Sequence, residues 1–254
     1  MSSKSKMNFL AIAHSKRTET VPHFFHQSSL TSLLKPCETF NLWDWHSFDI
    51  GKSRQTLTEA FLNVPEATHL LFIDDDIAIP NQKSLIGMFD FLEQYGESIV
   101  SGLYFDKTPP HYPVLLSLIE DEKHLTVDFI CKNNNPPINK VLQVGAVALG
   151  FCLIKREVFE KIDSPWFVYN DSELLKKHVG EFLGEDMYFS LKARKAGYKL
   201  WVDTRADLLH YVPNWVGRKS TVESMTTGRD NMTVQLVNIR SRFLEKLNVQ
   251  DKSD

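Results

Sequence analysis

Short apolar runs alternate with amphipathic segments along the first half of the chain. A continuous apolar run is typical of a strand that is buried on both faces of a sheet. Such runs predict strands at residues 8–13, 69–73 and 98–104. Helices are expected to begin near Pro22 and after Pro80. This alternation indicates an α/β fold.

One of the amphipathic segments lies directly before the second predicted strand. Leu57, Ala60 and Phe61 are spaced so that they share one face of a helix. Ser53 has a side chain suited to the N-cap of that helix. From this start, Arg54 is expected to point outward from the first turn.

The second half of the chain has a more mixed pattern. Residues 112–118 and 125–130 predict strands, and the second of these is expected at a sheet edge. The apolar run 141–154 is too long for one ordinary strand, so we expect a bend at Gly145 or Gly150.

The length and composition fit one large globular domain. The chain has 254 residues, of which 43% are hydrophobic, and no stretch approaches the ~20 apolar residues that span a bilayer. The polar first residues lack the apolar segment of a secretory signal, so a cytoplasmic location is expected. Cys37, Cys131 and Cys152 have no metal-type spacing and are expected to be reduced thiols.

The charge balance bears on the class of partner. The net charge is −3 and the sequence pI is about 6.3. A chain of this charge has no overall positive field to attract nucleic acid or an anionic membrane, so nucleic acid is not an expected partner. An anionic ligand must therefore be held by local groups.

Three consecutive carboxylates, Asp74, Asp75 and Asp76, end the apolar run that starts at His69. Ligands of open α/β sheets bind beyond the carboxyl ends of the strands. Adjacent carboxylates repel one another unless a cation neutralises them, and oxygen ligands suit Mg²⁺ or Mn²⁺. A solvated acidic turn is the alternative that this run alone leaves open.

Two further groups have both a chemical and an ordinary interpretation. Glu185 and Asp186 begin a predicted helix that runs from Gly184 to Gly197, where acids also interact favourably with the helix dipole. His210 follows the next predicted strand, at residues 198–202, and a lone histidine is more often a packed side chain than a ligand. The order of all these groups along the chain is more informative than any one of them.

In this order the sequence resembles glycosyltransferases of the GT-A fold, within the large family 2-like group. The resemblance spans most of residues 8–211 and fades beyond Tyr211. The sequence departs from the pattern of this family before the acidic strand, where the chain reads Lys52-Ser53-Arg54-Gln55. The segments that carry the resemblance are Leu71–Asp76, Ser101–Tyr104 with Pro109-Pro110, Gly150–Phe159 with Pro165-Trp166-Phe167, and Gly184–Phe189 followed by Ala196–Asp203 and His210.

The resemblance implies a Rossmann-like, mixed but mainly parallel sheet flanked by helices in a single α/β domain of the GT-A type. It implies a catalytic domain at 8–211, and the polar residues 1–7 before it are expected to be disordered. Within that domain, 8–105 is the expected nucleotide-binding half and 106–211 the acceptor and catalytic half. Residues 212–254 are expected to form a C-terminal loop and helix.

The implied activity is metal-dependent transfer of a sugar from a nucleotide-diphosphate donor, with a UDP-sugar expected, to a hydroxyl of a saccharide or other acceptor. A diphosphate leaving group gains negative charge as its bond to the sugar breaks, and a bound cation stabilises that charge. The implied ligands of Mn²⁺ or Mg²⁺ are Asp74, Asp76 and His210. The residues implied to contact the nucleotide sugar are Ala13, His14, Ser15, Arg54, Asp74 and Asp75.

The acceptor hydroxyl needs a base as it attacks the anomeric carbon. By the resemblance, Asp186 is that base, with Glu185 in reserve, and the reaction inverts the anomeric configuration. Trp166 is the tryptophan with motif support for stacking on a sugar. The alternatives are a retaining enzyme on the same fold and a non-catalytic nucleotide-sugar binding module. A metal-dependent phosphotransferase or nucleotidyltransferase is disfavoured because the chain lacks a glycine-rich phosphate loop.

Overall fold

The structure is a computed structural model of the full chain, and it describes the residues 9–15, 38–44, 49–74, 76–79, 83–132, 135–169, 171–180, 183–211 and 215–216. Asp75, Cys37 and the helix expected near Pro22 lie outside the described residues. The chain divides into one compact unit at Met1–Val216, which contains all the described residues, and a second at Gly217–Asp254. The domain boundaries expected from the sequence stay predictions.

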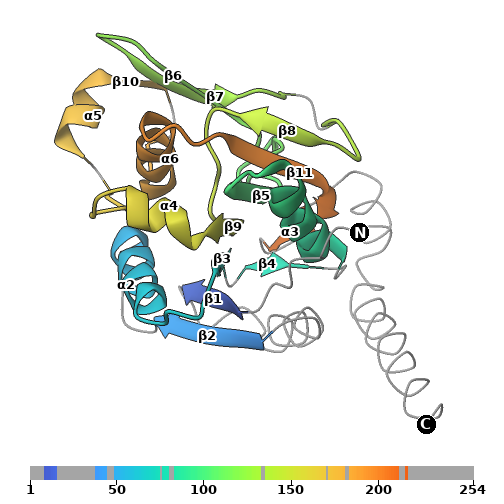
Figure 1. Ribbon diagram of the computed structural model, residues 1–254. Coiled ribbons are helices and arrows are strands. Elements are labelled where there is room, and N and C mark those ends of the chain that lie inside the picture. The colour runs from blue at the N-terminus through green and yellow to red at the C-terminus, as the bar shows by residue number, and fades with distance from the viewer. Residues whose placement is uncertain are drawn as a thin grey trace. The chain divides into compact units, whose positions relative to one another are not determined.

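A seven-stranded mixed sheet runs through this unit (Figure 1). Its strands, in spatial order, are β2 (Glu38–Asp44), β1 (Phe9–Ser15), β3 (His69–Asp74), β9 (Phe151–Lys155), β5 (Ile99–Leu103), β11 (Leu200–Asp207) and β8 (Val141–Val144). Three of the six pairings are parallel and three are antiparallel.

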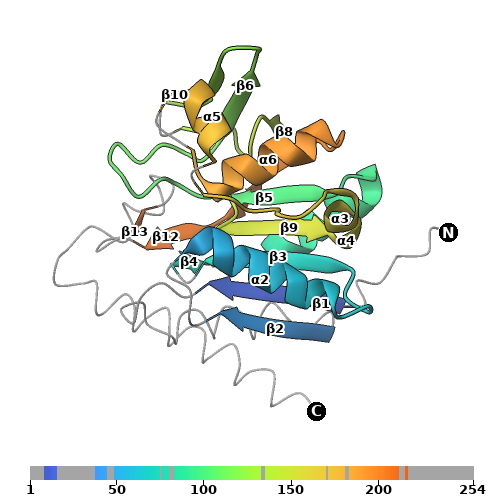
Figure 2. The ribbon, with the colours of Figure 1, turned by 90° about the vertical axis from the view of Figure 1, so that its left-hand side faces the viewer.

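The α/β class with a mixed sheet is confirmed, but the prediction of a mainly parallel sheet is wrong. Two strands are the reason: β9 lies between β3 and β5 and runs antiparallel to both, and the edge strand β8 runs antiparallel to β11. The other long strands keep a common direction, because β1 pairs parallel with β2 and β3, and β5 pairs parallel with β11. Figure 2 shows β1 and β2 pointing toward the side of the sheet where β12 and β13 lie.

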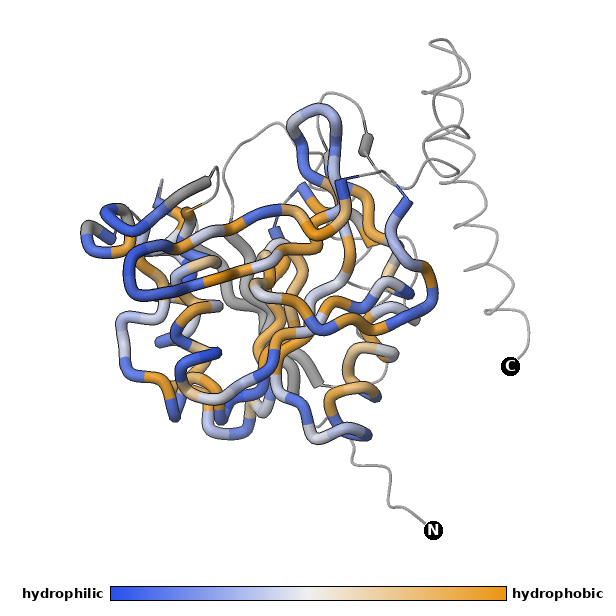
Figure 3. Tube along the Cα trace, turned by 90° about the horizontal axis from the view of Figure 1, so that it is seen from above, coloured by the Kyte–Doolittle hydropathy of each residue, from blue (hydrophilic) through white to orange (hydrophobic). Residues whose placement is uncertain are grey.

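Alternating residues of β3 build two separate cores, because successive side chains of a strand point to opposite faces. Leu70 and Phe72 belong to the core beneath α2 (Ile50–Leu62), α4 (Arg156–Lys161) and α6 (Glu185–Lys195). Leu71 and Ile73 belong to the core beneath α3 (Lys83–Tyr95) on the other face. Figure 3 shows hydrophobic residues along the central strands and hydrophilic residues in many of the connecting turns.

Two smaller sheets flank the main one. One has the order β10 (His178–Gly180), β7 (Leu125–Phe129), β6 (Leu116–Glu120), and α5 (Ser172–Lys177) precedes β10. The strand expected at a sheet edge is therefore central, because β10 pairs with its free side. The other small sheet has the order β13 (Trp215–Val216), β12 (Leu209–Tyr211), β4 (Ile77–Ala78). No helix in the described ranges is long and apolar enough to cross a membrane.

Helix α2 begins earlier than the sequence pattern predicts. Its N-cap is Asp49, whose carboxylate accepts a hydrogen bond from the backbone N–H of Lys52 at 3.2 Å. Ser53 is thus a buried residue within the helix, and the predicted N-cap is wrong. Arg54 is also buried, with 3% of its surface exposed, so the outward orientation is wrong. Arg54 has the spacing of i, i+3 and i+7 with Leu57 and Phe61, which places all three on one face.

The long apolar run bends as predicted. Strand β8 ends at Val144 and β9 begins at Phe151. At Gly145 a Cβ atom would lie 2.0 Å from the backbone nitrogen of Leu118, and at Gly150 it would lie 2.8 Å from the hydroxyl of Tyr104. Both glycines therefore permit a close approach that no larger residue allows. Gly150 thereby brings the backbone close to Tyr104, a residue of the candidate site.

Candidate active site

The carboxyl ends of the parallel strands bring the predicted site residues to one edge of the sheet. Asp74 ends β3 and Tyr104 directly follows β5. Strand β11 leads into β12, where His210 pairs with Ile77 of β4, just after the acidic run. The site is thus assembled from three separate parts of the sequence by sheet topology.

Asp76 and His210 lie next to each other, as the metal prediction requires. The Nε2 atom of His210 is 3.5 Å from Oδ1 of Asp76, and Lys107 forms an ion pair with Oδ2. Burial raises the pKa of Asp76, but hydrogen bonding and the charges of His210 and Lys107 outweigh it and lower the pKa to about 2. Asp76 is therefore a carboxylate across the physiological range.

The imidazole of His210 is oriented by a backbone carbonyl. Its Nδ1 atom lies 2.7 Å from the carbonyl oxygen of Phe105, which can only accept a hydrogen bond, so Nδ1 carries the proton. Nε2 then presents either a second proton or a lone pair to Asp76. Oδ1 of Asp76 is buried and has no hydrogen-bond partner among the described residues. A lone pair facing a carboxylate oxygen is repulsive unless a cation lies between them.

These two side chains fit a divalent cation. Two atoms that each lie about 2.1 Å from one ion are roughly 3.0 to 3.5 Å apart, which matches the separation of Nε2 and Oδ1. The described part of the chain contains no group of three or more His, Cys, Asp or Glu side chains that could hold a metal. That is compatible with Mg²⁺ or Mn²⁺, since such ions are commonly held by one or two side chains together with water and substrate phosphate.

Asp74 faces a different partner. Its two carboxylate oxygens lie 2.9 and 3.2 Å from Nη2 of Arg54, while Nη1 of Arg54 bonds to Glu185. Burial lowers the pKa of Arg54, but the charges of Asp74 and Glu185 more than offset this and raise it, so the guanidinium stays charged. Arg54 thus ties α2, β3 and α6 together. The metal-binding role of Asp74 and the reserve role of Glu185 stay predictions.

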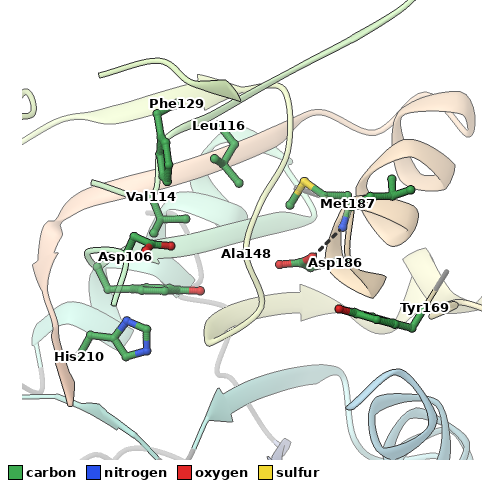
Figure 4. Close-up of a pocket in the computed structure, with 12 residues that line it drawn as sticks. Asp106, Val114, Leu116, Phe129, Ala148, Tyr169, Asp186, Met187 and His210 are labelled. Carbon is green, nitrogen blue, oxygen red and sulfur yellow. Dashed lines mark hydrogen bonds between the residues drawn. The ribbon is translucent and has the colours of Figure 1, made fainter. Parts of the chain in front are cut away.

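Asp186 lies in a pocket of about 350 Å³ that His210 also lines (Figure 4). Its Oδ1 atom accepts a hydrogen bond of 2.9 Å from the backbone N–H of Met187. Burial and the neighbouring charge of Glu185 raise the pKa of Asp186 to about 7, against a lowering effect of Arg54. A carboxylate with this pKa can accept and release a proton near neutral pH. The lining residues are Tyr104, Asp106, Val114, Leu116, Phe129, Ala148, Tyr169, Leu183, Gly184, Asp186, Met187 and His210.

The pocket includes aromatic residues that the sequence did not single out. Phe129 comes from β7, and Tyr169, which is 53% exposed, precedes α5. Trp166, expected to stack on a sugar, is instead a core residue whose indole N–H donates to the carbonyl of Ile162 at 2.7 Å. Tyr104 lies in a motif segment, yet neither spacing nor composition assigned it a role.

The predicted nucleobase contacts lie on β1. Ser15 is in register with Asp74, so the backbone of β1 ends at the same edge of the sheet as the acidic run. The side chains of Ala13, His14 and Ser15 lie outside what the structure describes, as does Asp75. Their contacts with a nucleotide stay predictions.

No family model and no curated protein sequence matches the chain. The structure is similar to that of A197 from STIV, with a TM-score of 0.54 and 18% identity, covering 84% of this chain and 95% of that one. GalNAc-T7 with UDP, GalNAc and Mn²⁺ has a TM-score of 0.47 and 10% identity, covering 82% of this chain and 44% of that one. The inositol-1-phosphate CTP transferase from T. maritima has a TM-score of 0.41 and 12% identity, covering 93% and 96%.

The fold is shared with A197. The other two similarities are distant ones, to GT-A-like nucleotide-binding folds found among glycosyltransferases and nucleotidyltransferases. At these identities they assign no family and no reaction. The side chains of the site, rather than these similarities, therefore indicate what the protein does.

Proposed function

We propose that this protein is a metal-dependent glycosyltransferase that moves a sugar from a nucleotide-diphosphate donor, with UDP as the expected nucleotide, to an acceptor hydroxyl. One observation carries the proposal. A single pocket contains Asp186, with a pKa of about 7, and the imidazole that pairs with the carboxylate of Asp76. Asp186 would be the proton acceptor, and His210, on the wall of the same cavity, belongs to a His–Asp pair that would bind a cation. Sugar transfer from a diphosphate requires both functions.

The end of the pocket at His210 suits the leaving diphosphate. Asp76 and His210 would hold Mn²⁺ or Mg²⁺, which would supply a positive charge that stabilises the departing diphosphate. An aspartate is ionised at neutral pH, and the backbone carbonyl of Phe105 orients the imidazole so that Nε2 faces Asp76. Lys107 adds a further positive charge beside the same carboxylate.

Asp186 would act on the acceptor. As the acceptor oxygen bonds to the anomeric carbon, its proton passes to the carboxylate of Asp186, and the bond from that carbon to the diphosphate oxygen breaks with its electron pair. The nucleoside diphosphate leaves, and the product is the glycosylated acceptor. A single displacement of this kind inverts the anomeric configuration, which we propose for this site.

Two variants of the pocket test the role of Asp186. In Asp186→Asn, turnover of the UDP-sugar should fall at least 100-fold with little change in donor binding, because the amide cannot accept the proton. Asp106→Asn is the matched control, since it makes the same change in another carboxylate of the pocket, one that accepts a hydrogen bond from the backbone N–H of Thr108. Release of UDP, measured with a panel of acceptors, reports turnover.

The pH dependence sharpens this test. The active form of the base is the carboxylate, so the rate should fall about tenfold per pH unit below the pKa of about 7. Asp186→Asn should lose this dependence. Near-normal turnover in Asp186→Asn would remove the base from the proposal. Tight binding of nucleotide sugars without turnover would favour a binding module, and a product of retained configuration would favour a retaining enzyme.

A further inference from the structure

Tyr104 lies where two parts of the proposed site meet. It directly follows β5, is 6% exposed and lines the pocket that contains Asp186. Its ring packs edge-on against the imidazole of His210, with ring centroids 5.3 Å apart and an interplanar angle of 84°. The side chain is therefore fixed by packing, and a fixed polar group in a pocket can select a ligand.

The hydroxyl of Tyr104 has an unused donor. It accepts a hydrogen bond of 3.1 Å from the backbone N–H of Gly150 and makes no other hydrogen bond within the described ranges. A tyrosine phenol has an ordinary pKa of about 10, so this group is neutral at physiological pH and keeps its proton. A phenol has one donor as well as its acceptor sites, so the O–H remains available to a ligand.

The position of this donor indicates which part of a ligand it would meet. In the proposed function, the diphosphate binds at the His210 end and the acceptor hydroxyl binds at Asp186. The transferred sugar is bonded to the diphosphate and is attacked by the acceptor hydroxyl, so it must lie between these two groups. Tyr104 contacts the ring of His210, and it lines the same pocket as Asp186.

We propose that the hydroxyl of Tyr104 donates a hydrogen bond to one oxygen of the transferred sugar, and that it thereby helps to select the donor. This inference rests on the proposed function for the identity of the ligand. A site built to bond a substrate hydroxyl rejects an analogue that lacks it more strongly than an apolar pocket does. Tyr104 would thus be a determinant of donor specificity rather than a group that moves a proton.

The competing explanation is structural, namely that the hydroxyl of Tyr104 serves only to accept the hydrogen bond from the backbone N–H of Gly150. Ser101 offers a matched control for this explanation. The hydroxyl of Ser101 lies within hydrogen-bonding distance of the carbonyl oxygens of Ala148, at 3.0 Å, and Phe151, at 3.1 Å. Ser101 lies in β5 and not among the residues that line the pocket, so Ser101→Ala removes a buried hydroxyl that contacts the same turn as Tyr104. Tyr104→Phe removes the phenol oxygen and keeps the ring.

The test is calorimetric titration with UDP, with UDP-glucose and UDP-galactose, and with their singly deoxygenated forms, all with Mn²⁺. Tyr104→Phe should weaken binding of the preferred UDP-sugar about three- to tenfold and leave UDP binding unchanged. In the wild type, one deoxygenated donor should show a similar loss. In Tyr104→Phe that same donor should show no further loss, because the bond is already absent. Ser101→Ala should change none of these ratios.

Two results would overturn the inference: equal weakening of UDP and UDP-sugar in Tyr104→Phe, or equal losses for every deoxygenated donor in both proteins. Melting temperatures of both variants show whether either is misfolded. This test measures binding and not turnover, so failure of the inference on Tyr104 can be distinguished from failure of the proposed function. Donor discrimination by Tyr104 in a protein whose Asp186→Asn variant turns over normally would support this inference and contradict the other.

Discussion

Near each end of strand β3 there is a cluster of three side chains, in which a histidine lies opposite a carboxylate and a lysine pairs with that carboxylate. At its amino end, Nε2 of His69 is 3.8 Å from Oε1 of Glu93, which Lys155 also approaches at 2.9 Å. At its carboxyl end, Nε2 of His210 is 3.5 Å from Oδ1 of Asp76, which also pairs with Lys107. By residue type and distance the two clusters are nearly alike.

Their surroundings differ. His69 packs edge-on against the ring of Phe89, with centroids 5.2 Å apart, and burial lowers its pKa to about 4, against a raising effect of Glu93. At this end the buried atom without a hydrogen-bond partner among the described residues is Nε2 of His69, while Glu93 pairs with Lys155 as Asp76 pairs with Lys107. His210, in contrast, lines a pocket and faces a buried carboxylate oxygen that has no hydrogen-bond partner in the described part of the chain.

The comparison shows that a histidine near an acid does not by itself make a site. What distinguishes the carboxyl end is an unsatisfied oxygen, an imidazole oriented by a backbone carbonyl, and space for a ligand. If this distinction is correct, matched substitutions at the two ends should have different effects on metal binding.

The largest difference should come from the two carboxylates. Asp76→Ala should weaken Mn²⁺-dependent binding of UDP by about 100-fold or more, because it removes the charged ligand of the pair. Glu93→Ala, at the other end of β3, should change it less than about twofold. Calorimetric titration of UDP at saturating Mn²⁺ measures both, and circular dichroism confirms that the variants are folded. Undiminished binding in Asp76→Ala would remove this residue from the site.

The histidines should show a smaller difference. His210→Gln should weaken Mn²⁺ binding about 10- to 100-fold, since it removes one nitrogen ligand and leaves Asp76 in place. His69→Gln should leave Mn²⁺ affinity unchanged. Electron paramagnetic resonance of free Mn²⁺ measures the affinity in each protein. Equal effects of the two substitutions would mean that the ends of β3 are equivalent, contrary to our interpretation.

The control variant His69→Gln should also change how the free energy of unfolding depends on pH. The pKa of His69 is about 4 in the folded chain, below its ordinary value of 6.5. Between these pH values the unfolded chain binds a proton that the folded chain does not, so stability falls as the pH is lowered through this range. The loss is at most about 3 kcal/mol. His69→Gln should remove that part of the pH dependence, which chemical denaturation at several pH values would show.

Much of the scaffold was predictable from the sequence because it is encoded locally. The apolar run that ends at Asp74 is a strand, the bend between Gly145 and Gly150 is present, and Asp76 and His210 lie together. The antiparallel placement of β9 was not predictable, because an apolar run specifies burial and not direction. The buried orientation of Arg54 was predictable in principle, because its spacing with Leu57 and Phe61 puts it on the apolar face of the helix.

The finer features of the site depend on contacts between distant segments. The carbonyl of Phe105 that orients His210, and the N–H of Gly150 that binds Tyr104, are backbone groups of unrelated parts of the chain. Phe129 and Tyr169 reach the pocket from a small sheet and a loop. No spacing in one sequence carries this information, because it arises only when the sheet assembles.

The most direct test of the central claim is the position of a bound metal. Crystals grown with Mn²⁺ and UDP should show an anomalous scattering peak roughly 2.2 Å from both Oδ1 of Asp76 and Nε2 of His210, next to the diphosphate. Such a peak would support a cation site built by these two residues. UDP bound in the pocket with Mn²⁺ coordinated elsewhere, or with no peak between Asp76 and His210, would contradict the account.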